Sequence, residues 1–444
     1  MDSDININKD ELLSKAIHHR IQGENVIAVS FISKCLDLCG LSLDSFETVD
    51  SSNFIQIFNN LIEKEKILVY KLIEEMTINA FYINSGKKLG LRLSELLLFC
   101  TNNIGCANIN KNMIHNNELF YLNKLDIIKR KQVQCDMPFI DDTFIQRYNP
   151  LNPSIIKIDN GYMILCRGVN YNQTNASDYK SMDKDGMIRT RNFIVLMDIN
   201  LNKISQSEIV DKSVRDKLPT RVLGLEDCHL VKIDDTAWFT CTTLDTNPVR
   251  VPQISLCKLP TQLDENGNCA VTELTPLNGP NPNRCEKNWL PFSHEDKLAV
   301  IYHYNPITIK LIEFDELKPT GNTNTAIERE IQYDFSRFRG SAGPIDFNYK
   351  KNEGKLAVIH EVIFRNDGRR YFHRFIWFDQ NYDIKAVSYP WYMDHIGIEF
   401  CKALVNSHME NEILLGVGIE DKEAWIYHIS KNIVHEMLHN IESL

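Results

Sequence analysis

Carboxylates and cationic side chains recur beside short apolar segments over the last two thirds of the chain. The clusters are Asn152-Pro153 with Arg167, Glu226 through His229, Glu286 through Asn288, Arg339 through Pro344 with His360 and Arg374, and Glu399 with Asp421. A carboxyl group can pass a proton to a reacting oxygen, and an arginine or lysine can bind a phosphate. If the apolar segments converge, these groups predict a single site that combines an acid with several cations.

The elements that would position these clusters are short strands. After residue 145, apolar segments such as residues 154–158, 193–199 and 413–419 are separated by turns rich in Gly, Asn, Asp and Pro. No helices are interleaved, which argues against a doubly wound α/β fold. Five blades of roughly 55–60 residues fit the length of residues 145–444, so we predict a mainly β fold, a five-bladed β-propeller. A pair of β-sandwiches is the structural alternative.

The segment before residue 135 shows helical spacing instead, and we predict an α-helical domain over residues 1–135. The expected helices cover residues 10–22, 25–38, 54–64, 66–83 and 91–101. Residues 80–99 resemble the helix–turn–helix unit of tetratricopeptide repeats. This repeat-like domain would be a docking surface for a protein partner or a long acceptor, or else a cap that only stabilises the catalytic domain.

Composition and charge exclude several classes of protein. The 444 residues carry a formal net charge of −10, and no long basic run offers a nucleic-acid footprint. No stretch reaches the ~18 apolar residues of a membrane-spanning helix, and the polar start of the chain lacks a signal-peptide core. The 12 cysteines show no Cys-x-x-Cys spacing, as expected for free thiols in a reducing compartment. We therefore expect a cytoplasmic protein.

The order and spacing of the polar clusters resemble the β-1,2-mannoside phosphorylases of glycoside hydrolase family 130 and the related β-mannosyltransferases. The family's Gly-x-Glu-Asp-Pro-Arg motif is similar to Gly224 through His229, and its Lys-Asp or Lys-Asn element before Leu-Phe-Pro is similar to Lys287-Asn288. Further similar elements are Tyr302 through Pro306, Gly340 through Ile345, Ile359 through Glu361 and Leu415 through Asp421. The resemblance spans residues 147–430.

This resemblance implies an inverting glycosyl-transfer enzyme that acts on a mannoside or a related hexoside. Asp227 then corresponds to the family's catalytic acid, which acts through a sugar hydroxyl, and phosphate itself can be the nucleophile. Lys287 corresponds best to the family's phosphate or sugar contact. The residues expected to bind phosphate or sugar are Asn152, Arg167, Glu226, Lys287, Asn288, His303, Arg339, His360, Arg374 and Asp421.

Departures from the family pattern leave the donor open. Cys228-His229 replaces Pro-Arg, and Tyr304 replaces an arginine after His303, so two cationic positions are lost or weakened. A sugar phosphate or nucleotide sugar could therefore be the donor to a glycan acceptor, and no cofactor is expected. The alternative function is a non-catalytic propeller that binds glycan or protein. Trp238, Trp289 and Tyr304 could stack on sugar rings or lie in the core.

Two short motifs have metal-site spacing. His435-Glu436-x-x-His439 matches zinc hydrolases, and Asp183-x-Asp185 matches the metal-holding motif of nucleotide-sugar transferases. The first motif has no third ligand downstream and fits a short C-terminal helix over the propeller. The second lies in a polar loop and fits a solvated turn. We therefore expect no metal, and a zinc hydrolase is the third functional hypothesis.

Overall fold

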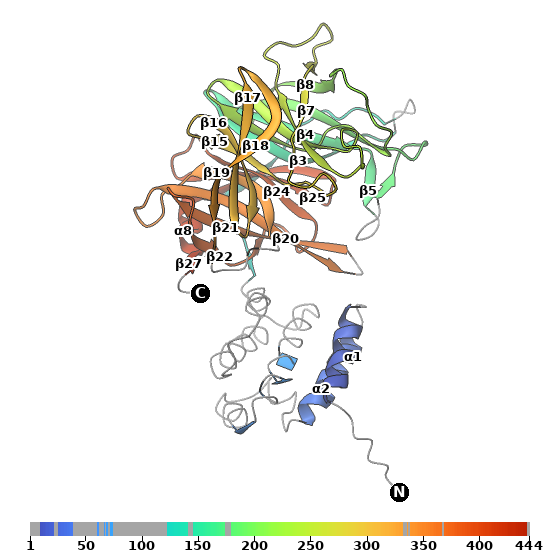
Figure 1. Cartoon of the computed structure of the whole chain (residues 1–444), viewed down its shortest axis with the longest axis vertical. Coiled ribbons are helices and arrows are strands. Elements are labelled where there is room, and N and C mark those ends of the chain that lie inside the picture. The colour runs from blue at the N-terminus through green and yellow to red at the C-terminus, as the bar shows by residue number, and fades with distance from the viewer. Residues whose placement is uncertain are drawn as a thin grey trace. The chain divides into compact units, whose positions relative to one another are not determined.

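A computed structural model gives the fold of the chain (Figure 1). It describes residues 9–21, 25–38, 60–61, 66, 68–69, 72–73, 122–140, 145–173, 179–331, 335, 338–365 and 368–441. The chain divides into two compact units, Met1–Asn123 and Lys124–Leu444. All the candidate site residues named above belong to the second unit.

The described part of the first unit contains two helices that pack against each other, α1 (Lys9–Ile21) and α2 (Asn25–Asp37). Both lie where the helical spacing predicts them. Leu12 and Ala16 on α1 and Ile32 and Leu36 on α2 are buried, one turn apart on each helix. The tetratricopeptide-like interpretation depends on residues 80–99, which lie outside the described residues, and the structure gives it no support.

The second unit is mainly β, as predicted, and its strands pair almost entirely in antiparallel ladders. The first sheet contains β3 (Asn149–Ile158), β4 (Gly161–Val169), β7 (Ile188–Asp198), β8 (Lys203–Asp211), β9 (Val222–Leu223) and β13 (Cys269–Val271). The second sheet contains β10 (Glu226–Ile233), β11 (Thr236–Thr243), β12 (Gln253–Lys258) and β14 (Leu274–Pro276). The third sheet contains β15 (Leu290–His294), β16 (Lys297–Tyr304), β17 (Ile307–Asp315) and β18 (Lys318–Arg329).

The last two large sheets follow the same meander. The fourth sheet contains β19 (Arg339–Asp346), β20 (Gly354–Arg365), β21 (Gly368–Asp379), β22 (Ile384–Ser388), β23 (Trp391–Tyr392) and β27 (Leu438–Asn440). The fifth sheet contains β24 (Glu399–Asn406), β25 (Glu412–Ile419), β26 (Glu423–Ser430) and β2 (Lys129–Gln132). The seventh strand of the fourth sheet is β1 (Asn123–Lys124), which pairs with β23. The remaining described elements are the hairpin of β5 (Tyr171–Gln173) with β6 (Tyr179–Ser181), and α8 (Lys431–Met437).

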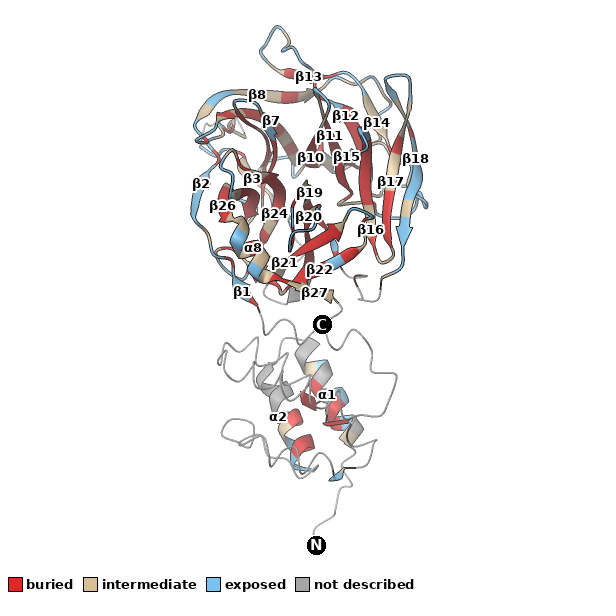
Figure 2. Cartoon of the chain, turned by 90° about the vertical axis from the view of Figure 1, so that its left-hand side faces the viewer, coloured by how far each residue is buried: buried red, intermediate tan, exposed pale blue. Residues whose placement is uncertain are grey.

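The five large sheets form a closed ring. The inner strands β3, β10, β15, β19 and β24 each contact the inner strand of the next sheet, and β24 contacts β3. Figure 2 shows these strands around the middle of the unit, with outer strands such as β8 and β18 at its periphery. Each pair of neighbouring sheets encloses its own apolar core, marked in ring order by Phe239, Trp289, Phe378, Phe375 and Tyr162. This arrangement differs from two packed sandwiches.

Residues 124–135 belong to the β unit, so the domain boundary predicted near residue 135 lies too late in the sequence. Strand β2 pairs in antiparallel register with β26, as in the pair Lys129 with His428. The segment Lys-Arg-Lys-Gln is an outer strand with mostly exposed side chains. It therefore lacks the alternation of apolar and polar residues that identifies a half-buried strand.

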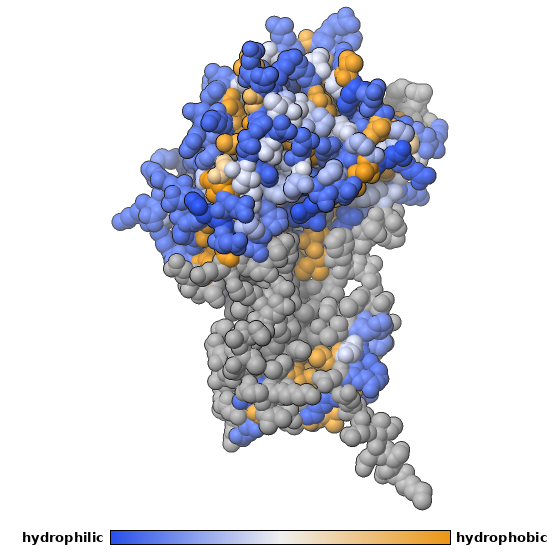
Figure 3. Space-filling model, in the orientation of Figure 1, coloured by the Kyte–Doolittle hydropathy of each residue, from blue (hydrophilic) through white to orange (hydrophobic). Residues whose placement is uncertain are grey.

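The described surface of the second unit is mostly polar on the face shown in Figure 3, where hydrophobic residues form small separate groups. Large exposed hydrophobic residues such as Val214 and Leu317 are ordinary for a globular surface when scattered. No described helix is long and apolar enough to cross a membrane.

Candidate active site

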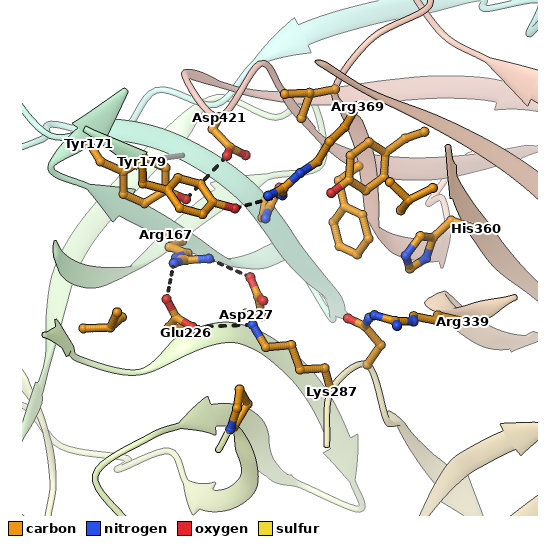
Figure 4. Close-up of a pocket in the computed structure, with 18 of the residues that line it drawn as sticks. Arg167, Tyr171, Tyr179, Glu226, Asp227, Lys287, Arg339, His360, Arg369 and Asp421 are labelled. Carbon is orange, nitrogen blue, oxygen red and sulfur yellow. Dashed lines mark hydrogen bonds and ion pairs between the residues drawn. The ribbon is translucent and has the colours of Figure 1, made fainter. Parts of the chain in front are cut away.

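A cavity of about 500 Å³ opens where the sheets converge. Figure 4 shows its labelled side chains pointing toward one another from several strands. The candidate site residues that line it are Asn152, Arg167, Glu226, Asp227, Lys287, Asn288, Arg339, His360 and Asp421. The ring thus brings together nine of the eleven predicted residues, although they span most of the second unit. Their functional roles remain predictions.

Left-handed backbone turns present several of these side chains to the cavity. Asn152, Asp227 and Asn288 have φ values of 47°, 48° and 61° and occur at or just before the inner strands β3, β10 and β15. The pairing registers of β3 with β4 and of β10 with β11 shift at the first two of these positions. Aspartate and asparagine tolerate this conformation better than other non-glycine residues. The recurrence explains why a polar cluster precedes each of these apolar strands.

Two glycines allow close approaches beside the cavity. Gly224 has a φ of 101°, and a Cβ atom there would lie 2.3 Å from the backbone oxygen of Thr190. A Cβ atom on Gly418 would lie 2.1 Å from Oδ1 of Asn152. Any larger residue would displace the chain before Glu226 in the first case and the Asn152 side chain in the second.

A buried ion-pair network forms one wall of the cavity. Arg167 donates from Nη1 to Oδ1 of Asp227 at 2.7 Å and from Nη2 to Oε1 of Glu226 at 3.0 Å. Its Nη2 also donates to Oγ1 of Thr190 at 3.1 Å. The Arg167 side chain is only 7% exposed, whereas that of Asp227 is 22% exposed. One guanidinium therefore orients both members of the acidic pair, while Asp227 keeps an open side toward the cavity.

The charges around Asp227 keep its carboxyl group ionised in the ligand-free protein. Burial acts to raise the pKa of Asp227, but the positive charges of Arg167, Lys402 and Lys287 outweigh it and hold the pKa below the ordinary value. A general acid works best with a pKa near the working pH. Asp227 can therefore donate a proton only if a ligand first reduces the influence of these cations.

Further nitrogen groups face the same part of the cavity. Nζ of Lys287 lies 3.8 Å from Oε2 of Glu226. Arg339, which lines the cavity from β19, has no ion pair within the described part of the chain. His360 is neutral at pH 7, because burial and the charge of Arg339 lower its pKa to about 3. Lys287 and Arg339 are thus available to an anion, and His360 offers a neutral ring.

The opposite wall is aromatic and carries a different carboxyl group. Asp421 accepts a hydrogen bond from the Tyr171 hydroxyl at 3.4 Å, and burial raises the Asp421 pKa above its ordinary value. The rings of Tyr171 and Tyr179 meet edge to face, with centroids 4.6 Å apart. Nη1 of Arg369 donates to the Tyr179 hydroxyl at 2.9 Å (Figure 4). Such a wall combines ring faces with hydrogen-bonding tips, which suits a sugar ring.

Two buried polar atoms beside the cavity have no hydrogen-bond partner among the described residues. They are Oδ1 of Asn152 and Nδ1 of His360. A buried polar atom without a partner is costly. Hydroxyl groups of a bound ligand could satisfy both atoms, because a hydroxyl both donates and accepts.

His303 and Arg374 do not line the cavity, which corrects the sequence-based assignment of both residues. His303 lies on β16, the second strand of its sheet, and its Nδ1 accepts a hydrogen bond from the backbone N–H of Asn305 at 3.2 Å. Arg374 lies on β21, the third strand outward, and donates to the backbone oxygen of Ser388 at 3.1 Å. Its partner inside the sheet is Glu361, at 4.0 Å. Both side chains therefore bond within their own sheets, and neither is among the residues that line the cavity.

The aromatic residues of the cavity also differ from those predicted. Trp238, Trp289 and Tyr304 are buried in the cores between sheets. The rings that line the cavity belong to Tyr171, Tyr179, Tyr371 and Phe400. Tyr171 and Tyr179 come from the short β5–β6 hairpin, outside the apolar strands predicted from the sequence. Arg369 and Lys402 were not predicted as site residues from the sequence either. Lys402 could have been identified, because it is a charged residue inside an apolar strand.

Neither metal-like motif has the geometry of a metal site. Helix α8 ends at Met437, so His435 lies in the helix and His439 lies in β27. His435 packs against Phe347, and His439 packs against Tyr389. In the second motif, Arg189 donates to Asp183 at 2.6 Å and to Asp185 at 2.9 Å. Among the described residues, no group of three or more His, Cys, Asp or Glu side chains could hold a metal ion.

Comparison with known proteins finds structural likenesses at low sequence identity. No family model matches the sequence, and no curated protein matches it. One similar solved structure is a β-1,2-mannobiose phosphorylase from Listeria innocua with β-1,2-mannobiose, at 12% identity and a TM-score of 0.45, covering 69% of this chain and 96% of that chain.

Two further solved structures come from Leishmania mexicana. A mannose phosphorylase in complex with phosphate has 11% identity and a TM-score of 0.40, covering 71% of this chain and 92% of that chain. A GDP-Man-dependent mannosyltransferase has 13% identity and a TM-score of 0.39, covering 69% of this chain and 90% of that chain. Mannoside phosphorylases and mannosyltransferases are thus among the structural neighbours of the chain. At these scores they are likenesses only.

Proposed function

We propose that the second unit is a five-bladed β-propeller that catalyses inverting glycosyl transfer on a mannoside or a related hexoside. The activity would be that of a glycoside phosphorylase or a glycosyltransferase. One observation carries the proposal: a half-buried carboxylate, Asp227, shares a single cavity with Arg167, Lys287 and Arg339. An acid beside several cations is sufficient for glycosyl transfer to or from phosphate, because phosphate needs no protein base to act as a nucleophile.

In the proposed reaction, the two walls of the cavity would bind different parts of the substrates. In phosphorolysis, a phosphate oxygen bonds to the anomeric carbon from one face while the bond to the glycosidic oxygen breaks on the other. The leaving oxygen takes a proton that comes from Asp227 through a sugar hydroxyl, as the family resemblance implies. Lys287 and Arg339 hold the phosphate oxygens, since both cations face the cavity. Asp421 and Asn152 bind the hydroxyls of the sugar.

Binding of the anion would also favour protonation of Asp227, which takes the proton from solvent. In the free protein, Arg167, Lys402 and Lys287 keep Asp227 ionised. A phosphate or sugar phosphate beside Lys287 and Arg339 introduces negative charge that opposes these cations and raises the pKa of Asp227. The carboxyl group would then become protonated when the donor is in place. The same argument holds for the diphosphate of a nucleotide sugar.

A second candidate function is a non-catalytic propeller that binds glycan or protein. The observation that favours it is the ion pair itself, because Arg167 already neutralises Asp227 at 2.7 Å. A carboxylate held in this way is a good acceptor for sugar hydroxyls without any proton transfer. The helices of the first unit could provide a further surface for a protein partner in either case.

The test is to incubate the full chain with β-mannosides and inorganic phosphate. Separate reactions contain sugar 1-phosphates or nucleotide sugars, with and without acceptors. Product formation with inversion at the anomeric carbon, followed by NMR, supports the enzyme. Loss of that activity in D227N would link it to the cavity. Saturable glycan binding by calorimetry without any product from any donor would support the binding protein and overturn the proposed enzyme.

A further inference from the structure

Lys402 is a buried cation that touches neither the donor nor the acceptor in the proposed reaction. It lies within β24, in the apolar segment Phe-Cys-Lys-Ala-Leu-Val, and is only 1% exposed. A buried lysine is costly unless it is paired or hydrogen-bonded. A position inside an apolar strand therefore calls for a specific partner.

That partner lies across the ring. Nζ of Lys402 donates to the backbone oxygen of Asp227 at 2.7 Å. Lys402 belongs to the fifth sheet and Asp227 to the second, and these sheets are not neighbours, because the first sheet lies between them. The side chain thus spans the central channel and ties the acidic pair to the opposite side of the ring.

The contact lies between two cavities. Asp227 lines the candidate active site, while Lys402 and His229 line a second cavity of about 360 Å³ along the same inner strands. Asp227 has a φ of 48°, a conformation that its neighbours must hold in place. The hydrogen bond from Lys402 to the backbone oxygen of Asp227 fixes the peptide group between Asp227 and Cys228. It therefore also fixes the direction of the Asp227 side chain.

We propose that Lys402 is a positioning residue for Asp227, which it reaches across the channel so that the carboxylate is held pointing into the cavity. This inference rests on the proposed catalytic role of Asp227. The ammonium charge adds to the effect, since it contributes to holding Asp227 ionised until an anion binds.

The charged state of Lys402 is sensitive to its surroundings. Burial lowers the Lys402 pKa to about 8, although the charge of Asp227 opposes this shift. The titratable groups that face Lys402 are Asp227, Cys228 and His229 on β10, Arg167 on β4, Lys287 before β15 and His360 on β20. Above pH 8 the amine becomes neutral and its hold on Asp227 weakens. The free energy of unfolding changes in the opposite direction. Because the pKa of Lys402 is lower in the folded than in the unfolded state, stability should rise as pH increases from the folded value toward the unfolded value.

The first experiment compares K402M and K402R with the wild-type chain. K402M removes the charge and the donor at similar length, so kcat should fall about 10- to 100-fold, with KM within about threefold. The alkaline loss of kcat near pH 8 should disappear in K402M and move to higher pH in K402R. K232M is the matched control, because Lys232 lies on β10 and lines the second cavity but faces the exposed Asp235. A folded K402M with the kcat and pH profile of the wild type would overturn the inference.

A second measurement does not depend on turnover. The Asp227 carboxyl group is titrated by carbon NMR in aspartate-labelled protein, and D227N identifies its signal. K402M should raise the Asp227 pKa, because a nearby positive charge is removed, and K232M should leave it unchanged. An unchanged Asp227 pKa in K402M would overturn the inference even if no glycosyl transfer is found. If K402M does not fold, the K402R titration and the wild-type pH profile decide: a wild-type kcat that stays constant through pH 8 would contradict the proposal.

Discussion

The two carboxyl groups of the cavity, Asp227 and Asp421, have opposite environments. Asp227 is surrounded by Arg167, Lys287 and Lys402, and its pKa lies below the ordinary value in spite of burial. Asp421 has a tyrosine hydroxyl at 3.4 Å, and burial raises its pKa. Both project from left-handed turns, with φ values of 48° and 51°. Similar backbone geometry therefore presents two aspartates with opposite tendencies to hold a proton.

The comparison shows that the two walls of the cavity differ in composition. The wall around Asp227 contains Arg167 and Lys287, whereas the wall around Asp421 contains the aromatic rings of Tyr171 and Tyr179 with a single cation, Arg369. Under the proposed function, the first wall would bind the anionic part of the donor and the second the sugar ring. Groups whose environments push their pKa values apart are a common basis for assigning acid and base roles. A ligand with an anionic part and a sugar part would satisfy both walls at once.

The sharpest test of the comparison removes the proton of Asp227 without changing its shape. D227N should lower kcat by about 10²- to 10⁴-fold, the usual contribution of a general acid. Steady-state kinetics with the active donor measures this, and circular dichroism checks the fold. D183N is the control, since Asp183 also pairs with an arginine but lies outside the cavity. Full activity in D227N would mean that Asp227 is not the acid.

A smaller effect is expected at the cation that faces Glu226. K287A should raise KM for the phosphate-bearing donor about tenfold and change kcat little, because a contact made equally in the ground and transition states affects binding only. K232A, on the same side of the ring but outside the cavity, serves as the reference. A large loss of kcat with unchanged KM would assign Lys287 to the transition state instead.

Substitutions in the wall around Asp421 should have the weakest kinetic effect. D421N and Y171F should raise KM for the sugar about 2- to 10-fold, as expected when one hydrogen bond worth about 0.5–1.5 kcal/mol is lost. Binding of phosphate alone, measured by calorimetry, should not change. If either variant weakens phosphate as much as sugar, the two walls are not separate.

Substitution of the two aspartates should change the thermal unfolding temperature in opposite directions. The folded-state pKa of Asp227 is lowered, so its stabilising contribution is present above the unfolded value near 4 and is lost as pH falls through the folded value. The folded-state pKa of Asp421 is raised, so its contribution is present at low pH and is lost as pH rises through the folded value. At pH 7, D227N should therefore lower Tm and D421N should raise it, each by about 2–4 °C, the size of a 1 kcal/mol change in a large domain. Shifts of the same sign would contradict the comparison.

The sequence was sufficient to predict a mainly β second unit and most of the residues that line the cavity. Period-two apolar segments with polar turns predicted a mainly β unit, and the polar residue at the start of successive inner strands indicated Asn152, Asp227 and Asn288. It failed where the tertiary partner of a charged side chain matters. Arg374 lies inside an apolar strand as Lys402 does, but Arg374 donates to the backbone oxygen of Ser388 in its own sheet, whereas Lys402 reaches Asp227 across the ring. That distinction depends on where each side chain points in the folded sheets, which the local pattern does not encode.

The partners of these residues were also beyond the sequence. Lys402 and Asp227 are separated by 175 positions, and only closure of the ring brings them together. The sequence pattern does not predict the β5–β6 hairpin, because its strands are short and polar and Tyr171 and Tyr179 are their main apolar residues. Arg369 lies near the turn of the β20–β21 hairpin, where a solvated cation is the usual interpretation.

The pairing of β2 with β26 has a consequence for how the molecule is made. Lys129 and His428 are neighbours in the finished sheet, but β26 leaves the ribosome long after β2. Until then β2 has no partner, and the loop that must close is nearly as long as the unit itself, which slows folding. Lys402 and Asp421 both belong to this last sheet and its turns. The fifth sheet is therefore complete, with Lys402 and Asp421 in place, only after β26 has been synthesised.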